Sequence, residues 1–86
     1  MRIDKYLKLT RIIKRRTISK EIIENGRVEI NGKLVKPSAE VKPEDVVTLS
    51  FSRSKIEVKV LFVEEKIVKK DPDSAYKIMS ESKYEN

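Results

Sequence analysis

Eight lysine and arginine side chains lie within the first 20 residues of the sequence, and Asp4 is the only acidic residue among them. They are Arg2, Lys5, Lys8, Arg11, Lys14, Arg15, Arg16 and Lys20. Ammonium and guanidinium groups donate charged hydrogen bonds, and arginine can also hold a phosphate through two parallel bonds or stack on a base. The chemistry that this cluster supports is the binding of a polyanion.

The excess positive charge of the chain is confined to its first half. The 86 residues include 20 Lys or Arg and 14 Asp or Glu, which gives a net charge of +6. Residues 1–36 hold eleven basic and four acidic residues, a balance of +7, whereas residues 37–86 hold nine and ten, a balance of −1. Evenly spread charge would serve solubility, but concentrated charge indicates a polyanionic partner.

The composition excludes several kinds of site. Cys and His are absent, which excludes disulfides, thiolate nucleophiles, zinc fingers and imidazole acid–base chemistry. The carboxylates of Glu64 and Glu65, and of Asp71 and Asp73, lie in charged segments without a pocket-forming sequence, so we predict no catalytic residue, no metal ligand and no cofactor. No apolar run approaches the ~20 residues of a membrane helix, and no signal-peptide core is visible. We therefore expect a cytoplasmic protein that does not bind membranes.

Two amphipathic segments are expected to carry the basic cluster. Ile3, Leu7 and Thr10 recur with helical spacing, which predicts a first helix over residues 2–12 with its basic side chains on another face. A second helix is predicted over residues 17–25, where Gly26 suits the left-handed position after its end. The basic run at residues 14–16 would then lie at the bend between the two helices.

The remainder of the chain favours short strands. Asn31-Gly32 is typical of a two-residue hairpin turn between strands at 27–30 and 33–35. Pro43 is placed for the second position of a turn over residues 41–45. Alternating apolar residues predict strands near 47–51 and 56–60, and the apolar run 61–63 is expected to close the sheet. A short final helix is predicted over 74–83, with Asp73 as its cap. The fold class is a compact α+β domain.

Four segments resemble the S-four domain, the alpha-L RNA-binding motif, over about residues 1–50. They are Arg2-Ile3-Asp4-Lys5-Tyr6-Leu7, Lys14-Arg15-Arg16-Thr17-Ile18-Ser19-Lys20-Glu21, Ile23-Glu24-Asn25-Gly26-Arg27-Val28-Glu29-Ile30-Asn31-Gly32 and Lys36-Pro37-Ser38. Many S-four domains carry Gly between the two helices and Gly-Asp before the late strand, where this sequence has Thr10-Arg11 and Glu44-Asp45. The resemblance marks Arg2 and Arg16 most strongly as RNA-binding residues. Asp4 is interpreted as the residue that orients an arginine, and Tyr6 as a core residue.

The resemblance implies a fold and a function. The fold would be two N-terminal helices packed on a small antiparallel sheet with a short C-terminal helix, divided into an RNA-binding domain at 1–66 and a charged linker with a helical tail at 67–86. Among stand-alone S-four proteins, the sequence is similar to the RqcP family of bacterial ribosome quality control factors. These are non-enzymatic and bind large subunits that carry stalled peptidyl-tRNA. The implied partners are large-subunit rRNA, peptidyl-tRNA and an RqcH/NEMF-type factor that adds C-terminal alanine tails, with the protein acting as a monomer.

Three alternatives follow from the same residues. The related small heat-shock S-four protein recycles free large subunits with peptidyl-tRNA instead of supporting tailing. S-four modules also occur on pseudouridine synthases and tyrosyl-tRNA synthetase, but the residues after the motif are too few for either catalytic domain. A membrane- or DNA-binding surface is disfavoured, because the basic residues span a bend between two helices instead of following one long amphipathic helix.

Overall fold

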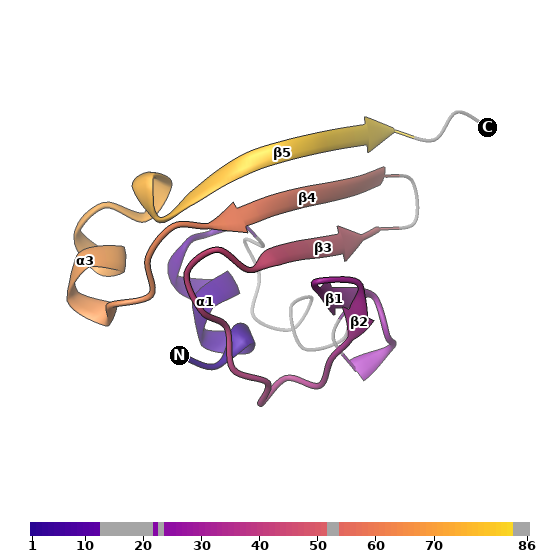
Figure 1. Ribbon diagram of the computed structural model, residues 1–86, viewed down its shortest axis with the longest axis horizontal. Helices are drawn as coiled ribbons and strands as arrows, with labels where there is room; N and C mark the ends of the chain where they lie inside the picture. Colours follow the sequence, from indigo (N-terminus) through magenta and orange to yellow (C-terminus); the bar gives the residue numbers. More distant parts are fainter. Residues whose placement is uncertain (13–21, 23, 52–53, 84–86) are drawn as a thin grey trace.

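A five-stranded antiparallel sheet forms the centre of the fold (Figure 1). The computed structural model describes residues 1–12, 22, 24–51 and 54–83. The strands lie in the order β2-β1-β3-β4-β5. The bounds of these strands are β1 Val28–Ile30, β2 Lys33–Leu34, β3 Val46–Ser50, β4 Ser54–Val60 and β5 Tyr76–Lys83, and the helical elements are α1 Ile3–Leu9, α3 Glu65–Lys70 and the 3-10 turn η1 Pro72–Ala75. The predicted α+β class is confirmed.

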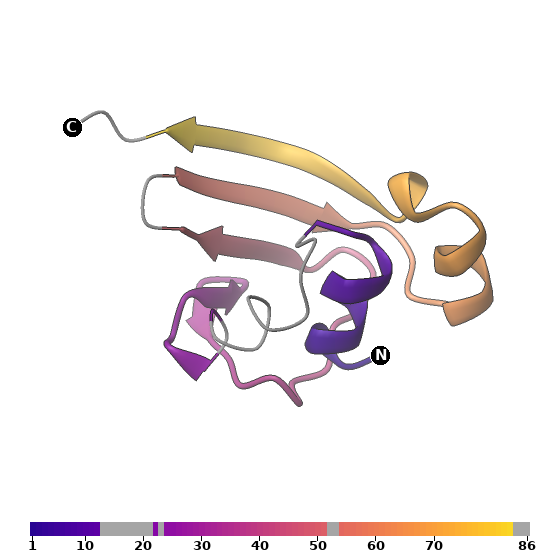
Figure 2. The same cartoon turned by 180° about the vertical axis from the view of Figure 1, so that it is seen from behind.

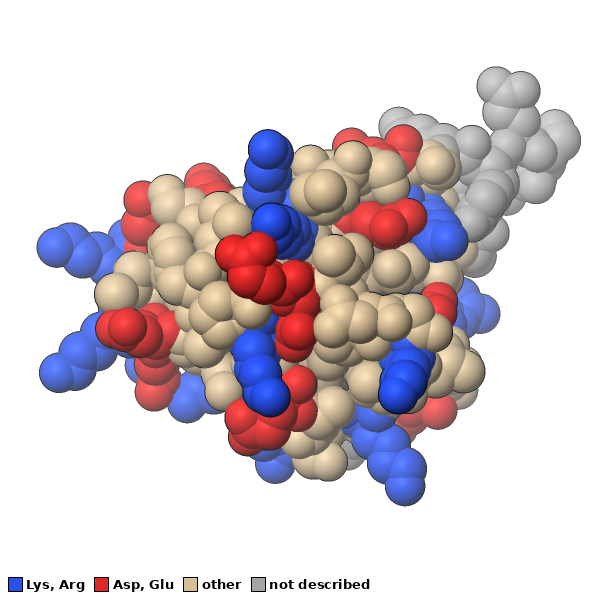
Figure 3. Space-filling view, in the orientation of Figure 1, with Lys and Arg blue, Asp and Glu red and all other residues tan. Residues whose placement is uncertain are grey.

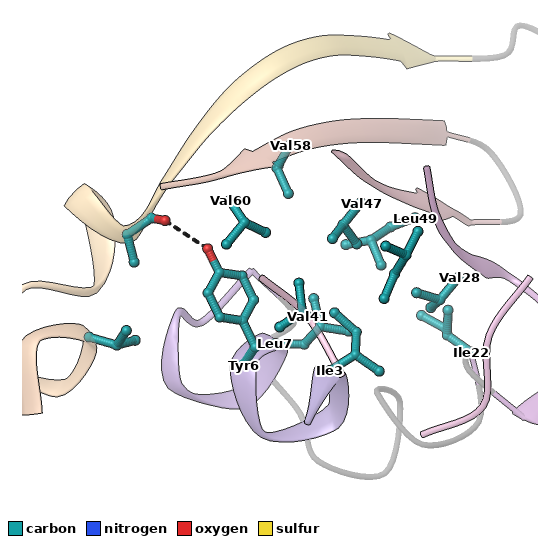
Figure 4. Close-up of a cluster of buried hydrophobic side chains, with 13 residues drawn as sticks. Ile3, Tyr6, Leu7, Ile22, Val28, Val41, Val47, Leu49, Val58 and Val60 are labelled. Atoms are coloured by element: carbon teal, nitrogen blue, oxygen red, sulfur yellow. Dashed lines mark hydrogen bonds between the residues drawn. The ribbon is translucent and has the colours of Figure 1, made fainter. Parts of the chain in front are cut away.

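Helix α1 packs on one face of the sheet through three buried side chains. Ile3, Tyr6 and Leu7 are fully buried and point toward the inward side chains of β3 and β4 (Figure 4). Figure 2 shows from behind how α1 lies under these strands. The helix is shorter than the predicted 2–12. It ends at Leu9, and the hydroxyl of the next residue, Thr10, donates to the carbonyl oxygen of Tyr6 at 2.7 Å.

The predicted second helix at 17–25 lies largely outside the described residues. Within it, Ile22 and Glu24 are helical, and the Ile22 side chain is buried against the core. Gly26 has φ +70, as expected for the left-handed residue after a helix. The predicted arrangement of two N-terminal helices therefore remains a prediction.

The core lies between the sheet and α1. Alternate residues of the central strands point inward, so Val47 and Leu49 of β3 and Val58 and Val60 of β4 are fully buried. The opposite residues of these strands face away from α1. This outer face carries Lys55 and Lys59, and Lys77 pairs with Lys59 across the β4–β5 register.

Local turn chemistry explains two turns of the described chain, the β1–β2 hairpin and the turn before β3. Asn31 and Gly32 both have positive φ, 52° and 84°, which is the type I′ hairpin turn predicted from their sequence. In the second turn, Asp45 N donates to Lys42 O at 3.1 Å. Pro43 occupies its second position and Glu44 its third with φ +79, the conformation for which glycine is preferred.

The C-terminal helix predicted over 74–83 is wrong, because residues 76–83 form strand β5. Its helical stripe of Ala75, Met79 and Ser82 was weak, whereas β4 offers an open edge with which the segment pairs from Val60↔Tyr76 to Ser54↔Lys83. The hydrogen bonds and side-chain contacts of this pairing decide the conformation over local propensity. The predicted strand at 61–63 is also wrong, since these residues lead to α3 without joining the sheet.

Candidate RNA-binding surface

The exposed side of α1 carries lysines because its other side packs in the core. Ile3, Tyr6 and Leu7 face the sheet, so Lys5 and Lys8, which are three residues apart, share the solvent side. Arg2 precedes the first turn and Arg11 follows the last, and both are exposed. The structure therefore brings four of the predicted basic residues to one short helix.

Arg2 is held in a defined orientation by Asp4. Its Nε donates to Asp4 Oδ1 at 3.2 Å and its Nη2 donates to Asp4 Oδ2 at 3.0 Å. Asp4 Oδ1 also accepts from the backbone N of Lys5 at 2.8 Å, and a carboxylate in the first turn is favoured by the helix dipole. The predicted orienting role of Asp4 is consistent with this geometry, which leaves the other edge of the guanidinium turned to solvent.

Lys5 has an acidic neighbour that lies far away in sequence. Its Nζ lies 2.7 Å from Oε1 of Glu65 in α3, and Nζ of Lys69 lies 3.3 Å from the same oxygen. Hydrogen bonds from Lys5 and then Lys69 lower the pKa of Glu65. Because the folded-state pKa is lowered, this contact favours folding at neutral pH and is lost as the pH falls through that pKa. Sequence spacing gave no signal for this pair.

Lys8 and Arg11 have no ion-pair partner within the part of the chain that the structure describes. Arg11 also has φ +59, the left-handed conformation that side chains with a Cβ disfavour by about 1–2 kcal/mol. This is one of the two places at which many S-four domains carry Gly. An arginine kept at a strained backbone position is favoured by something other than the stability of the fold.

The substitution Arg11→Gly is expected to separate stability from binding. It should raise the free energy of unfolding by about 0.5–1 kcal/mol, because glycine relieves more strain at positive φ than it adds in unfolded-chain entropy. It should also weaken RNA binding, because one phosphate-seeking cation is lost. Urea denaturation and RNA titration of the same protein would check both signs. Tighter RNA binding by the glycine variant would contradict a role for the Arg11 side chain.

Tyr6 is a core residue and is not available to stack on a base. Its hydroxyl donates to the carbonyl oxygen of Ala75 at 2.7 Å, shown as the dashed line in Figure 4. Burial, with a smaller contribution from Tyr76, raises the pKa of Tyr6 well above its usual range. The bond ties α1 to the segment just before β5.

The remaining basic residues of the predicted cluster, Lys14, Arg15, Arg16 and Lys20, lie outside the described residues, and their role stays a prediction. The described residues contain no group of three or more acidic side chains arranged to hold a metal ion. Their helices include none that is long and apolar enough to cross a membrane.

The S4 domain family model matches residues 1–47, which include α1 and the first two strands. Over 85 residues the chain is 45% identical to the RQC P-site tRNA stabilizing factor of Streptococcus pneumoniae, covering 99% of this chain and 97% of that one. The chain belongs to this family of S4-domain proteins. The factor of the same name from Bacillus subtilis is 41% identical, with 96% of each chain covered.

A solved structure supports the fold assignment. The trimeric structure of Vibrio cholerae heat shock protein 15 superposes with a TM-score of 0.78 over 93% of this chain and 82% of that one. Its sequence identity is 23%, so this likeness shows the S4-type fold alone. The full-length match at 45% identity favours the tRNA stabilizing factors over the heat-shock type.

Proposed function

We propose that the chain is a non-enzymatic factor of ribosome quality control. It binds the large ribosomal subunit that carries a stalled peptidyl-tRNA, contacts both ribosomal RNA and that tRNA, and supports alanine tailing of the nascent chain. The observation that carries the proposal is the 45% identity, over almost the whole of both chains, to a factor named for stabilizing the P-site tRNA. The exposed cations of α1 supply a surface suited to that role.

The proposed action is positional. RNA helices present phosphates and 2′-hydroxyls across a wide, shallow minor groove, so a small basic domain can recognise them by shape and charge. Arg2, oriented by Asp4, and Lys8, exposed on the same helix, would each neutralise a phosphate. A domain that contacts rRNA and tRNA together stabilises their mutual position without any bond being made or broken.

The proposal includes a place and partners. A factor that acts on ribosomes works in the cytoplasm, and an RqcH/NEMF-type tailing factor is the proposed protein partner. We propose that the protein acts as a monomer. The lack of Cys and His supports a binding role over a catalytic one, because the usual nucleophiles and proton shuttles are missing.

Alanine tailing of a stalled reporter tests this function. Cells lacking the gene should make the reporter without alanine tails, and wild-type protein should restore them. The variant Arg2→Glu/Lys8→Glu should fail to restore them at equal protein level. If the deletion left tailing intact while free large subunits with peptidyl-tRNA accumulated, the recycling alternative would replace the proposal.

A further inference from the structure

Helix α3 carries a row of three lysines on the side that faces away from the core. Val68 is fully buried and anchors the helix. Lys66, Lys69 and Lys70 are all exposed, and their spacing of i, i+3 and i+4 places them on one helical face. At the end of the molecule where α3 lies, blue side chains project into solvent (Figure 3). These three residues are called the lysine row.

The lysine row is continuous with the basic side of α1. Nζ of Lys5 and Nζ of Lys69 lie at 2.7 and 3.3 Å from the same oxygen of Glu65, so the two ammonium groups are within about 6 Å of each other. The carboxylate attracts each ammonium group more strongly than the two cations repel one another, and the three groups together keep a net charge of +1. The two ammonium groups together could contact one phosphate or two neighbouring phosphates.

Apart from Glu65, the acidic residues near α3 lie at the ends of the helix or in η1. Glu64 and Asp71 flank the helix at its two ends, and Asp73 lies in η1. Asp71 accepts a hydrogen bond from the Ser74 hydroxyl at 2.7 Å, which is a local contact of η1. Among the described residues, Lys66 and Lys70 have no ion-pair partner. Within the lysine row, Glu65 pairs with Lys69, and the charges of Lys66 and Lys70 are left without a neutralising partner in the part of the chain that the structure describes.

The lysine row lies outside the part of the chain that matches the S4 domain. That match ends at residue 47, whereas α3 spans Glu65–Lys70. The relatives from Streptococcus pneumoniae and Bacillus subtilis align over 99% and 96% of this chain. The segment that holds α3 thus belongs to the full-length likeness but not to the general S4 module.

We propose that the lysine row, together with Lys5, is a second phosphate-binding surface that contacts the backbone of an RNA strand next to the one on α1. This inference rests on the proposed function, since it assumes that the chain binds RNA. Flexible ammonium groups on a single row read charge and spacing but no base sequence. The surface would therefore raise the affinity for RNA and fix the orientation of the protein on it, without distinguishing one base sequence from another.

The test compares two double variants that remove equal charge. Lys66→Gln/Lys70→Gln changes the lysine row. Lys55→Gln/Lys77→Gln changes the outer face of the sheet, away from α1. Protein-free large-subunit rRNA is titrated with each full-length chain at several salt concentrations. The slope of log K against log salt should become shallower by about 1.4–1.8 for the first variant, because each phosphate contact contributes about 0.7–0.9. The second variant should keep the wild-type slope.

Each outcome has a separate meaning. Equal slopes for both variants and wild type would overturn the second surface. If Lys66→Gln/Lys70→Gln lost binding to whole subunits but not to free rRNA, the lysine row would contact a ribosomal protein, and the RNA assignment would be wrong. If Arg2→Glu/Lys8→Glu bound free rRNA and whole large subunits as tightly as wild type does, the proposed function itself would fail. Unchanged thermal unfolding of both lysine variants is expected, because these side chains are exposed or half-buried and none of the four has a described ion-pair partner.

Discussion

Reversing two charges on α1 with Arg2→Glu/Lys8→Glu is expected to weaken binding to large ribosomal subunits by about 100-fold at physiological salt. Each reversal replaces an attraction to phosphate by a repulsion, at a cost of about 1–2 kcal/mol near a solvated surface. Arg2 pairs with Asp4 but stays exposed, and Lys8 is exposed without an ion-pair partner among the described residues, so both can contact an external ligand. Filter binding with labelled subunits would measure the loss.

The matched control is Lys55→Glu/Lys77→Glu, which makes the same change in net charge on the outer face of the sheet. It should bind within a few-fold of wild type, because long-range charge is screened beyond about 8 Å at this ionic strength. An equal loss for the two double variants would mean that RNA binding depends on net charge alone and that α1 is not a specific surface.

A chain shortened to residues 1–66 is expected to lose its cooperative unfolding transition at 25 °C. The deletion removes β5 from the edge of β4 and takes away Val68 and Ala75, both fully buried in the core. The lost apolar burial alone is worth about 3 kcal/mol, which is a large part of the stability of a domain of this size. Circular dichroism with urea would show a broad transition in place of a sigmoidal one. The same fragment tests whether residues 1–66 form a domain by themselves.

A single substitution tests the hydrogen bond between Tyr6 and Ala75 without removing the buried residues that the shortened chain loses. Tyr6→Phe removes only the hydroxyl that donates to Ala75 O. Ala75 O keeps its hydrogen bond from Leu61 N at 2.8 Å, so the loss of the Tyr6 bond should cost about 0.5–1.5 kcal/mol. The variant should still fold and unfold cooperatively. A shortened chain as stable as wild type, or a Tyr6→Phe variant with unchanged stability, would show that the segment after residue 66 does not support α1.

Features decided by neighbouring residues could be predicted from the sequence. The hairpin at Asn31-Gly32 follows from the positive φ that this pair tolerates, and the Arg2–Asp4 contact joins residues two positions apart. The family resemblance also marked the places at Arg11 and Glu44 where glycine is usual, and both have positive φ. These are local properties of a few residues.

Features decided by distant residues could not be predicted. Strand β5 forms because β4 has an open edge, and nothing within 76–83 specifies that partner. The bond from Tyr6 to Ala75 joins residues 69 positions apart, and the pair of Lys5 with Glu65 depends on where α3 packs. The sequence alone places Lys69 and Lys70 in a charged linker, because the proximity of this segment to α1 exists only in the folded chain.

Sedimentation of the tagged full-length protein through a sucrose gradient, with tRNA probed in each fraction, tests the central claim most directly. The proposed function predicts that wild-type protein migrates with free large subunits that carry peptidyl-tRNA, and that Arg2→Glu/Lys8→Glu stays at the top of the gradient. Wild-type protein that remained at the top with small soluble RNAs would contradict the ribosome quality control function.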